Sequence, residues 1–323
     1  KPLREYLRTS FEHGPGVEGS FLADPVFEAM FGWEPASQTM ADLAGKLLDA
    51  RLVDAMDAPA EAYRDNAFRK TWLPHLHQFE AWRMLREDPP RSVVVTSGTG
   101  SGKTECFLVP ILDDLVRQFD GGAKLLGSQA LFLYPLNALI NSQRDRLRAW
   151  TSAFNGRVRF CLYNGETPAN VPANQQRQHR EEVLSRQLLR AEPPPILVTN
   201  ATMLEYMLVR ADDRPILDAS QGKLRWIVLD EAHTYVGSQA AEIALLLRRV
   251  LHAFGVTPDQ VRFVATSATI GDSKDTGAAL ARFLADLAGI ADRQVSVISG
   301  QRLIPPLDKR WVNNNQPLPP IDQ

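Results

Sequence analysis

Apolar and polar residues alternate along the chain in the order expected of a parallel sheet covered by helices. Short, almost wholly apolar runs predict strands, and longer segments with apolar residues at helical spacing predict helices between them. The expected strands are residues 92–95, 129–134, 158–163, 195–199, 224–230, 261–266 and 294–298. The expected helices are residues 102–119, 136–151, 177–190, 201–210, 238–254 and 276–288. Strands that are apolar on both faces indicate an α/β fold with helices on both sides of the sheet.

The two ends of the chain depart from this alternation. Residues 1–70 predict an N-terminal accessory region of helices, including one amphipathic helix over residues 39–57. Residues 71–300 hold the strand–helix repeats and form the expected main domain. Residues 301–323, rich in Pro and Asn, predict an irregular linker. The chain therefore divides into an accessory region, one large α/β domain and a linker.

A glycine-rich turn between the first expected strand and its helix carries the clearest chemical signal. Residues 96–104, Thr-Ser-Gly-Thr-Gly-Ser-Gly-Lys-Thr, let backbone N–H groups gather around an anion at a helix N-terminus. Lys103 is placed to reach the outer phosphates of a nucleotide, and the Thr104 hydroxyl to hold Mg²⁺. The usual first glycine of such a phosphate-binding loop is replaced by Ser97. The residues expected to contact the nucleotide in this turn are Thr99, Gly100, Ser101, Gly102, Lys103 and Thr104.

Two adjacent acids end the expected strand at residues 224–230. Asp230 follows an apolar run and can bind Mg²⁺, directly or through a water molecule. Glu231 then points toward the position of an attacking water and is the candidate general base. An isolated Asp-Glu pair is usually a solvated helix start, but the preceding apolar strand argues against that explanation here. With Lys103, these acids predict a nucleoside triphosphatase.

Composition limits the kinds of partner that the chain can bind. The net charge is −2, so binding to nucleic acid requires a local groove rather than an overall positive field. The apolar fraction of 44% is that of an ordinary globular protein. Cys106 and Cys161 lie in expected core segments without metal-ligand spacing, which favours two reduced thiols in a reducing cytoplasm. We find no apolar run long enough for a membrane span.

In their order along the chain, these motifs resemble those of superfamily-two helicases of the DEAD/DEAH-box type. The phosphate loop is similar to motif I, Asp-Glu-Ala-His at residues 230–233 to motif II, and Ser-Ala-Thr at residues 267–269 to motif III. Residues 230–237 and 245–249 look most similar to large bacterial helicases of the YprA/MrfA, Lhr and DISARM/Druantia types. The resemblance implies a first RecA-like lobe that uses ATP and Mg²⁺.

The resemblance also implies roles for single side chains. Gln78 is similar to the glutamine that reads adenine, and His233, Ser267 and Thr269 would couple the nucleotide to the nucleic-acid groove and a second lobe. The residues implied to hold a single strand by its phosphodiester backbone are Pro135, Asn137, Gly165, Thr167, Thr199 and Asn200. Simpler explanations stay open, because a proline can merely end a strand and Thr199 and Asn200 can cap the next helix. The arginines expected to face solvent rather than DNA are Arg177, Arg180, Arg186 and Arg190.

The resemblance leaves three functions open. The first is a DNA helicase or translocase in repair or anti-phage defence, with single-stranded DNA favoured over RNA; the second is an RNA helicase. The third is a nucleotide-bound scaffold subunit of a defence complex. Only one helix–strand unit follows Thr269, so we expect a second RecA-like lobe in the same or a partner chain, and further subunits as partners. Alone, this chain should bind ATP weakly and hydrolyse it slowly.

Overall fold

The computed structural model describes residues 2–13, 20, 31–98, 100–119, 125–268 and 274–304. The chain divides into two compact parts, residues 1–32 with 302–323, and residues 33–301. In the first part, helix α1 spans Pro2–Glu12. All the candidate chemistry lies in the second part, and most of the expected linker, residues 305–323, lies outside the described residues.

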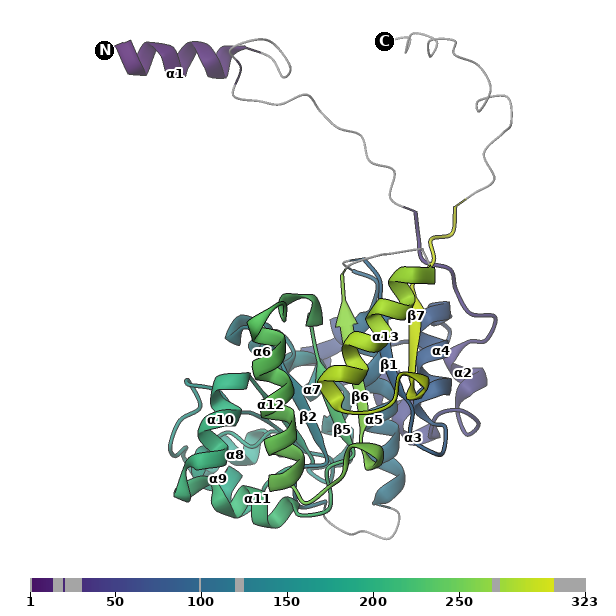
Figure 1. Ribbon diagram of the computed structural model, residues 1–323, viewed down its shortest axis with the longest axis vertical. Helices are drawn as coiled ribbons and strands as arrows, with labels where there is room; N and C mark the ends of the chain where they lie inside the picture. The colour runs from purple at the N-terminus through teal and green to yellow at the C-terminus, as the bar shows by residue number, and fades with distance from the viewer. Residues whose placement is uncertain are drawn as a thin grey trace. The chain divides into compact units, whose positions relative to one another are not determined.

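A seven-stranded parallel sheet forms the centre of residues 33–301 (Figure 1). Its strands are β1 (Ser92–Thr96), β2 (Ala130–Leu133), β3 (Phe160–Leu162), β4 (Ile196–Thr199), β5 (Trp226–Leu229), β6 (Arg262–Ser267) and β7 (Val295–Ser299). They lie in the order β3-β4-β2-β5-β6-β1-β7, and all their pairings are parallel. The predicted strands are confirmed, with ends that differ by two residues at most. The order places β5, β6 and β1 side by side, so the acids and the glycine-rich turn leave the same edge of the sheet.

Helices cover both faces of the sheet, as the apolar strands predict. One core lies between the sheet and the helices α3 (Ala50–Asp57), α4 (Leu76–Leu85), α5 (Lys103–Gln118) and α7 (Arg144–Thr151). A second core lies under α10 (Ala201–Val209), α11 (Arg214–Ser220), α12 (Ser238–Ala253) and α13 (Lys274–Ala288). In Figure 1, α12 and α13 lie on the near side of the sheet. The predicted α/β class is therefore confirmed.

Three predicted helices are divided in the structure. The expected helix over residues 39–57 is wrong, because Gly45 adopts φ +74° and Asp49 caps a new helix through the backbone N–H of Arg51. The result is α2 (Met40–Leu43) followed by α3. The expected helix 136–151 divides at Gln143 into α6 (Asn137–Ser142) and α7. The expected helix 177–190 is replaced by α8 (Ala173–Gln178) and α9 (Arg186–Ala191).

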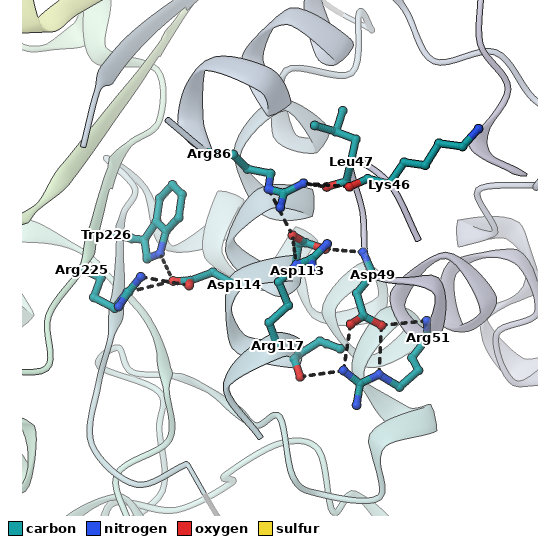
Figure 2. Close-up of polar contacts among 11 residues, drawn as sticks. Lys46, Leu47, Asp49, Arg51, Arg86, Asp113, Asp114, Arg117, Arg225 and Trp226 are labelled. Carbon is teal, nitrogen blue, oxygen red and sulfur yellow. Dashed lines mark hydrogen bonds and ion pairs between the residues drawn. The ribbon is translucent and has the colours of Figure 1, made fainter. Parts of the chain in front are cut away.

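Residues 33–70 pack against α5 as part of the same compact unit as the sheet, although the sequence predicts them as an accessory region. Asp113 of α5 is almost fully buried and accepts hydrogen bonds from the backbone N–H of Asp49 (2.5 Å) and from Arg117 (2.8 Å), as Figure 2 shows. Arg51 pairs with Asp49 (2.8 Å) and also donates to the carbonyl of Val116 (3.3 Å). The start of α3 is therefore tied to α5 by a buried carboxylate.

A second carboxylate on α5 fixes this helix against the sheet. Asp114 accepts two hydrogen bonds from Arg225 (2.9 and 3.0 Å) and one from the indole N–H of Trp226 (2.8 Å), at the start of β5 (Figure 2). From Lys103 to Asp114 the helix rises about 16 Å, and from Trp226 to Asp230 the strand advances about 13 Å. Because α5 runs antiparallel to β5, this clamp brings Lys103 close to the level of Asp230.

Two smaller predictions concern the cysteines and the membrane. Cys106 and Cys161 are free thiols, and both are buried as predicted. Within the part of the chain that the structure describes, no helix is long and apolar enough to cross a membrane.

Candidate active site

The glycine-rich turn joins β1 to α5 with a backbone that favours glycine. Gly100 and Gly102 have φ values of +73° and +76°. A Cβ atom on Gly102 would lie 2.2 Å from Nε2 of Gln78, so this position has little room for a side chain. Lys103 begins α5, and its Nζ donates to the carbonyl of Ser97 (3.0 Å). The lysine side chain thus lies folded back over the loop. Thr99 lies outside the described residues.

Two side chains of α4, Gln78 and His77, form hydrogen bonds to backbone carbonyls of this loop. Nε2 of Gln78 donates to the carbonyl of Gly102 (3.2 Å), while its Oε1 accepts from the backbone N–H of His75 (2.9 Å). Nε2 of His77 donates to the carbonyl of Ser101 (2.9 Å). Burial lowers the pKa of His77 to about 4, so this imidazole is neutral at pH 7. Gln78 therefore contacts the loop and lines the cavity described below, while its contact with adenine stays a prediction. His77 is a loop-positioning residue that the sequence reasoning missed.

The serine that replaces glycine in the loop has a structural role. Ser97 is fully buried, and its Oγ lies 2.5 Å from Oγ of Ser101 across the turn. Its backbone N–H donates to the carbonyl of Ser267 at the end of β6 (3.2 Å). Ser97 thus joins the two ends of the turn and ties it to the neighbouring strand.

The two acids at the end of β5 are arranged by a residue that the sequence reasoning also missed. The buried hydroxyl of Thr266, on β6, donates to Oδ1 of Asp230 and accepts from the backbone N–H of Glu231 (3.0 Å). Glu231 itself adopts φ +51°, a sharp left-handed turn. The register Leu229↔Ala265 places Thr266 beside Asp230, so an alignment of the two predicted strands could have found it. Thr266 fixes both acids at once.

The environment of Asp230 disfavours its negative charge, so a bound cation would stabilise the carboxylate. Burial raises the pKa of Asp230, the nearby Glu231 raises it further, and the Thr266 hydroxyl and Lys103 oppose them. Mg²⁺ prefers oxygen ligands and is usually held by one or two carboxylates together with substrate phosphates. Asp230 and the hydroxyl of Thr104 fit such a donor set. Among the described residues, no group of three or more His, Cys, Asp or Glu side chains could hold a metal by itself.

A cavity of about 910 Å³ brings the predicted nucleotide residues together. It is lined by the glycine-rich turn with Lys103, Thr104 and Glu231. Phe68, Trp72 and Trp150, among others, also line it. Such a volume is in the range of small-molecule sites, and charged groups together with aromatic rings suit a nucleotide. The aromatic lining was not predicted, because no motif marks residues 65–73.

Of the three predicted coupling residues, the structure describes His233 and Ser267. Nδ1 of His233 is 3.3 Å from Oε2 of Glu231, so the histidine contacts the candidate base. Ser267 ends β6, and its carbonyl accepts from Ser97 as described above. Thr269 lies outside the described residues.

The predicted nucleic-acid residues gather at the carboxyl ends of β2, β3 and β4. Asn200 donates to Asn137 (2.7 Å), which joins the loops after β2 and β4. The hydroxyls of Thr167 and Thr199 are buried and donate to the carbonyls of Leu162 and Tyr163. The side chains turned to solvent or half-buried at this edge are those of Pro135, Asn137 and Asn200, with the exposed backbone of Gly165. The two threonines therefore shape the loops from inside, and Asn200 also caps α10.

Arg186 and Arg190 are half-buried and bound to protein partners, so the prediction that they face solvent is wrong for both. Arg186 donates to the carbonyls of Thr167 (2.9 Å), Asn164 (3.3 Å) and Gly165 (3.3 Å). Arg190 pairs with the buried Asp213 (2.8 Å), which also accepts from the hydroxyl of Tyr163 (2.7 Å). Their backbone and carboxylate partners are distant in sequence, and composition gave no sign of them. Arg177 and Arg180 are exposed, as predicted.

Comparison with known proteins agrees with this geometry. Residues 76–276 match the family model of the DEAD/DEAH box helicases. The chain is 29% identical to the Druantia protein DruE of Escherichia coli (strain UMEA 4076-1), over 71% of this chain and 18% of that protein. It is 27% identical to the uncharacterized ATP-dependent helicase YprA of Bacillus subtilis (strain 168), over 63% of this chain and 24% of that protein.

A solved structure extends the likeness to the fold. The DUF1998 helicase MrfA bound to DNA superposes with a TM-score of 0.55 and 23% identity, over 82% of this chain and 31% of that chain. The predicted RecA-like fold is thereby confirmed, although this chain spans a third or less of the length of each of these three proteins. Since the family model covers more than half of its residues, the chain belongs to the DEAD/DEAH box helicase family.

Proposed function

We propose that this chain is the ATP-binding lobe of an ATP-dependent helicase or translocase that acts on single-stranded DNA. One observation carries the proposal: Lys103, Thr104 and Glu231 line a single cavity, and Asp230 lies beside Glu231, bonded to Thr266. Phosphoryl transfer in P-loop enzymes needs this set of a lysine, a hydroxyl, a metal-binding acid and a residue that orients water.

Each side chain has a distinct role in this proposal. Lys103 exchanges its bond to the Ser97 carbonyl for the outer phosphates of ATP, whose charge the N-terminus of α5 also attracts. Asp230 and Thr104 hold Mg²⁺, which would neutralise charge on the triphosphate. Glu231 orients the attacking water and accepts its proton, and His233 would link this base to a second lobe.

The nucleic-acid groove is proposed along the carboxyl ends of β2, β3 and β4. Backbone amides and small polar groups there can hold a phosphodiester backbone without a positive net charge. MrfA, with the same fold, is bound to DNA, which supports DNA as the substrate. The same fold also occurs in the DEAD-box helicase Mss116 bound to single-stranded RNA (TM-score 0.58, 15% identity), so the fold alone does not choose between them. A role in repair or anti-phage defence is proposed from the resemblance to YprA- and Druantia-type proteins.

The proposal includes a second RecA-like lobe. The chain spans about a fifth of DruE and a quarter of YprA, and phosphoryl transfer gains from additional arginines near the transferred phosphate. We propose that residues 33–301 form one motor lobe, that residues 302–323 lead toward the second, and that the lobe alone hydrolyses ATP slowly.

The test compares Lys103→Ala and Glu231→Gln in the longer protein that contains this lobe. Lys103→Ala should lose ATP binding, while Glu231→Gln should retain binding and lose at least about a hundredfold in turnover, because its base is removed. Wild-type turnover should rise with single-stranded DNA more than with RNA of the same sequence. Normal hydrolysis by Glu231→Gln would exclude this residue as the base, stimulation by RNA alone would favour an RNA helicase, and ATP binding without hydrolysis would favour a scaffold.

A further inference from the structure

One buried hydroxyl beside the acids of β5 has no evident function in the residues discussed so far. Tyr134 follows β2 and is fully buried, yet its hydroxyl has no hydrogen-bond partner among the described residues. Buried polar groups are nearly always paired, because an unpaired one loses its hydrogen bonds to water without replacement. An unpaired hydroxyl in a protein core is therefore free to bind a ligand atom, provided that a ligand site lies next to it.

The position of Tyr134 shows where such a partner would be. β2 pairs with β5 in the register Leu133↔Leu229, so the next residues, Tyr134 and Asp230, are neighbours on adjacent strands. The backbone N–H of Asp230 donates to the carbonyl of Leu133 (3.1 Å), which continues the ladder to this point. Tyr134 belongs to the core under α5, the helix that begins with Lys103. Its ring thus lies on the face of the sheet from which the phosphate loop approaches Asp230.

The charges around Tyr134 agree with this placement. Burial raises the pKa of Tyr134 well above its usual range, and the carboxylate of Asp230 adds to that effect. Arg146 lowers the pKa of Tyr134 and Glu105 raises it. Both residues line the nucleotide cavity, and Nη2 of Arg146 lies 3.5 Å from Oε1 of Glu105. The charges that act on this hydroxyl thus belong to residues of the candidate active site. The hydroxyl stays protonated at neutral pH and can both donate and accept a hydrogen bond.

Mg²⁺ in nucleotide sites usually keeps several of its water molecules, and each of these needs a hydrogen-bond acceptor. The Thr266 hydroxyl already donates to one carboxylate oxygen of Asp230. Asp230 therefore has less capacity to accept hydrogen bonds from the water molecules of the ion. We propose that the Tyr134 hydroxyl binds a water molecule of the hydrated Mg²⁺–ATP complex and thereby couples the nucleotide to the loop that begins at Pro135. This inference rests on the proposed ATPase function.

The backbone supports the coupling part of the proposal. The N–H of Tyr134 donates to the carbonyl of Thr199 (3.0 Å), and three residues further on Asn137 accepts from Asn200 (2.7 Å). A nucleotide that fixes the Tyr134 ring therefore acts on the start of the segment that joins β2 to α6. Two of the residues proposed to contact the nucleic-acid strand lie here: Pro135 in that segment and Asn137 at the start of α6.

The experiment compares Tyr134→Phe with Tyr235→Phe in the 323-residue chain. Tyr235 also carries a buried hydroxyl without a partner among the described residues, but it packs in the core on the other face of the sheet. ATP affinity is measured by calorimetry or tryptophan fluorescence, once with Mg²⁺ and once with EDTA. Tyr134→Phe should bind Mg²⁺–ATP about three- to tenfold more weakly, the loss of one hydrogen bond, and should bind ATP in EDTA like the wild type. Tyr235→Phe should match the wild type in both.

Two further measurements separate a ligand contact from a purely structural role. The melting temperature of nucleotide-free Tyr134→Phe should equal or exceed that of the wild type, since the substitution removes an unpaired polar group. Mg²⁺–ATP should slow hydrogen exchange of the amides of residues 136–139 in the wild type and not in Tyr134→Phe.

Each other result overturns the inference. Equal Mg²⁺–ATP affinity in wild type and Tyr134→Phe, an equal loss in EDTA, or a lower melting temperature would each show that the hydroxyl does not act through the hydrated metal. The same slowing of exchange in Tyr134→Phe would disprove the coupling. If the wild type itself fails to bind Mg²⁺–ATP, the proposed function fails as well, which distinguishes the two.

Discussion

Thr266 offers a sharp test of how the two acids are organised, through the substitution Thr266→Val. Valine has nearly the same volume, so the packing of β6 is retained while the bridge between Asp230 and the Glu231 backbone is lost. A hydrogen bond to a charged group contributes about 1.5–3 kcal/mol, and the side chain of Asp230 is largely buried. We therefore expect a loss of about 2 kcal/mol in unfolding free energy, or about 3–4 °C in melting temperature.

The pH dependence of this loss follows from the raised pKa of Asp230. Above that pKa the folded state carries a buried carboxylate that Thr266 helps to stabilise, so the difference between Thr266→Val and wild type is largest there. As the pH falls through the raised pKa toward the ordinary value of 3.8, Asp230 takes up a proton in the folded state and the difference should shrink. Urea unfolding of both proteins at a series of pH values measures this difference in unfolding free energy directly.

Thr151→Val is the matched control, because Thr151 is also fully buried but donates only to the carbonyl of Leu147 within its helix (2.6 Å). That substitution should cost at most about 1 kcal/mol, with no dependence on pH between 4 and 7. In the longer protein, Thr266→Val should also lower ATP turnover at least tenfold, since both acids lose their orientation. A loss of stability no larger than that of Thr151→Val, or one that does not vary with pH, would refute this account of Asp230.

Two other substitutions test the loops around the site. Arg186→Ala should weaken single-stranded DNA binding about tenfold in filter-binding or anisotropy assays, because the carbonyls of Asn164, Gly165 and Thr167 lose their common donor. The ATP affinity of this variant should not change. Its control is Arg177→Ala, since Arg177 is exposed. Gly102→Ala should abolish ATP binding in calorimetry, since its Cβ would meet Gln78 at a φ of +76°. Its control, Gly277→Ala, lies in α13 with nothing within 4 Å of the added Cβ and should stabilise the fold by about 0.5–1 kcal/mol. Wild-type DNA binding by Arg186→Ala, or wild-type ATP binding by Gly102→Ala, would contradict the roles given to these residues.

The strands and the phosphate loop could be predicted because their signals are local. Each central strand is apolar on both faces, so its pattern in the sequence does not depend on its neighbours. Gly102 and Lys103 are set by the geometry of a strand, a turn and a helix in immediate succession. The sequence reasoning therefore located the nucleotide-binding turn and the acids without knowledge of the sheet order.

The residues that were missed act across the sheet or between distant segments. Thr266 and His77 are ordinary strand and helix residues until Asp230 and the Ser101 carbonyl lie next to them. Arg186 lies in a polar stretch where solvent exposure is the usual outcome, and only folding brings it to the carbonyls of residues 164–167. The aromatic wall at Phe68 and Trp72 was missed for the same reason.

The bond between Asp113 and the start of α3 has a thermodynamic consequence for partners of this protein. Residues 33–70 supply part of the cavity wall, and they share the helix α5 with the phosphate loop. Any molecule that binds residues 33–70 and shifts α3 would change the affinity for ATP, and by reciprocity ATP would change the affinity for that molecule by the same factor. Allosteric control of ATP binding can therefore enter at a segment that precedes the helicase motifs in the sequence.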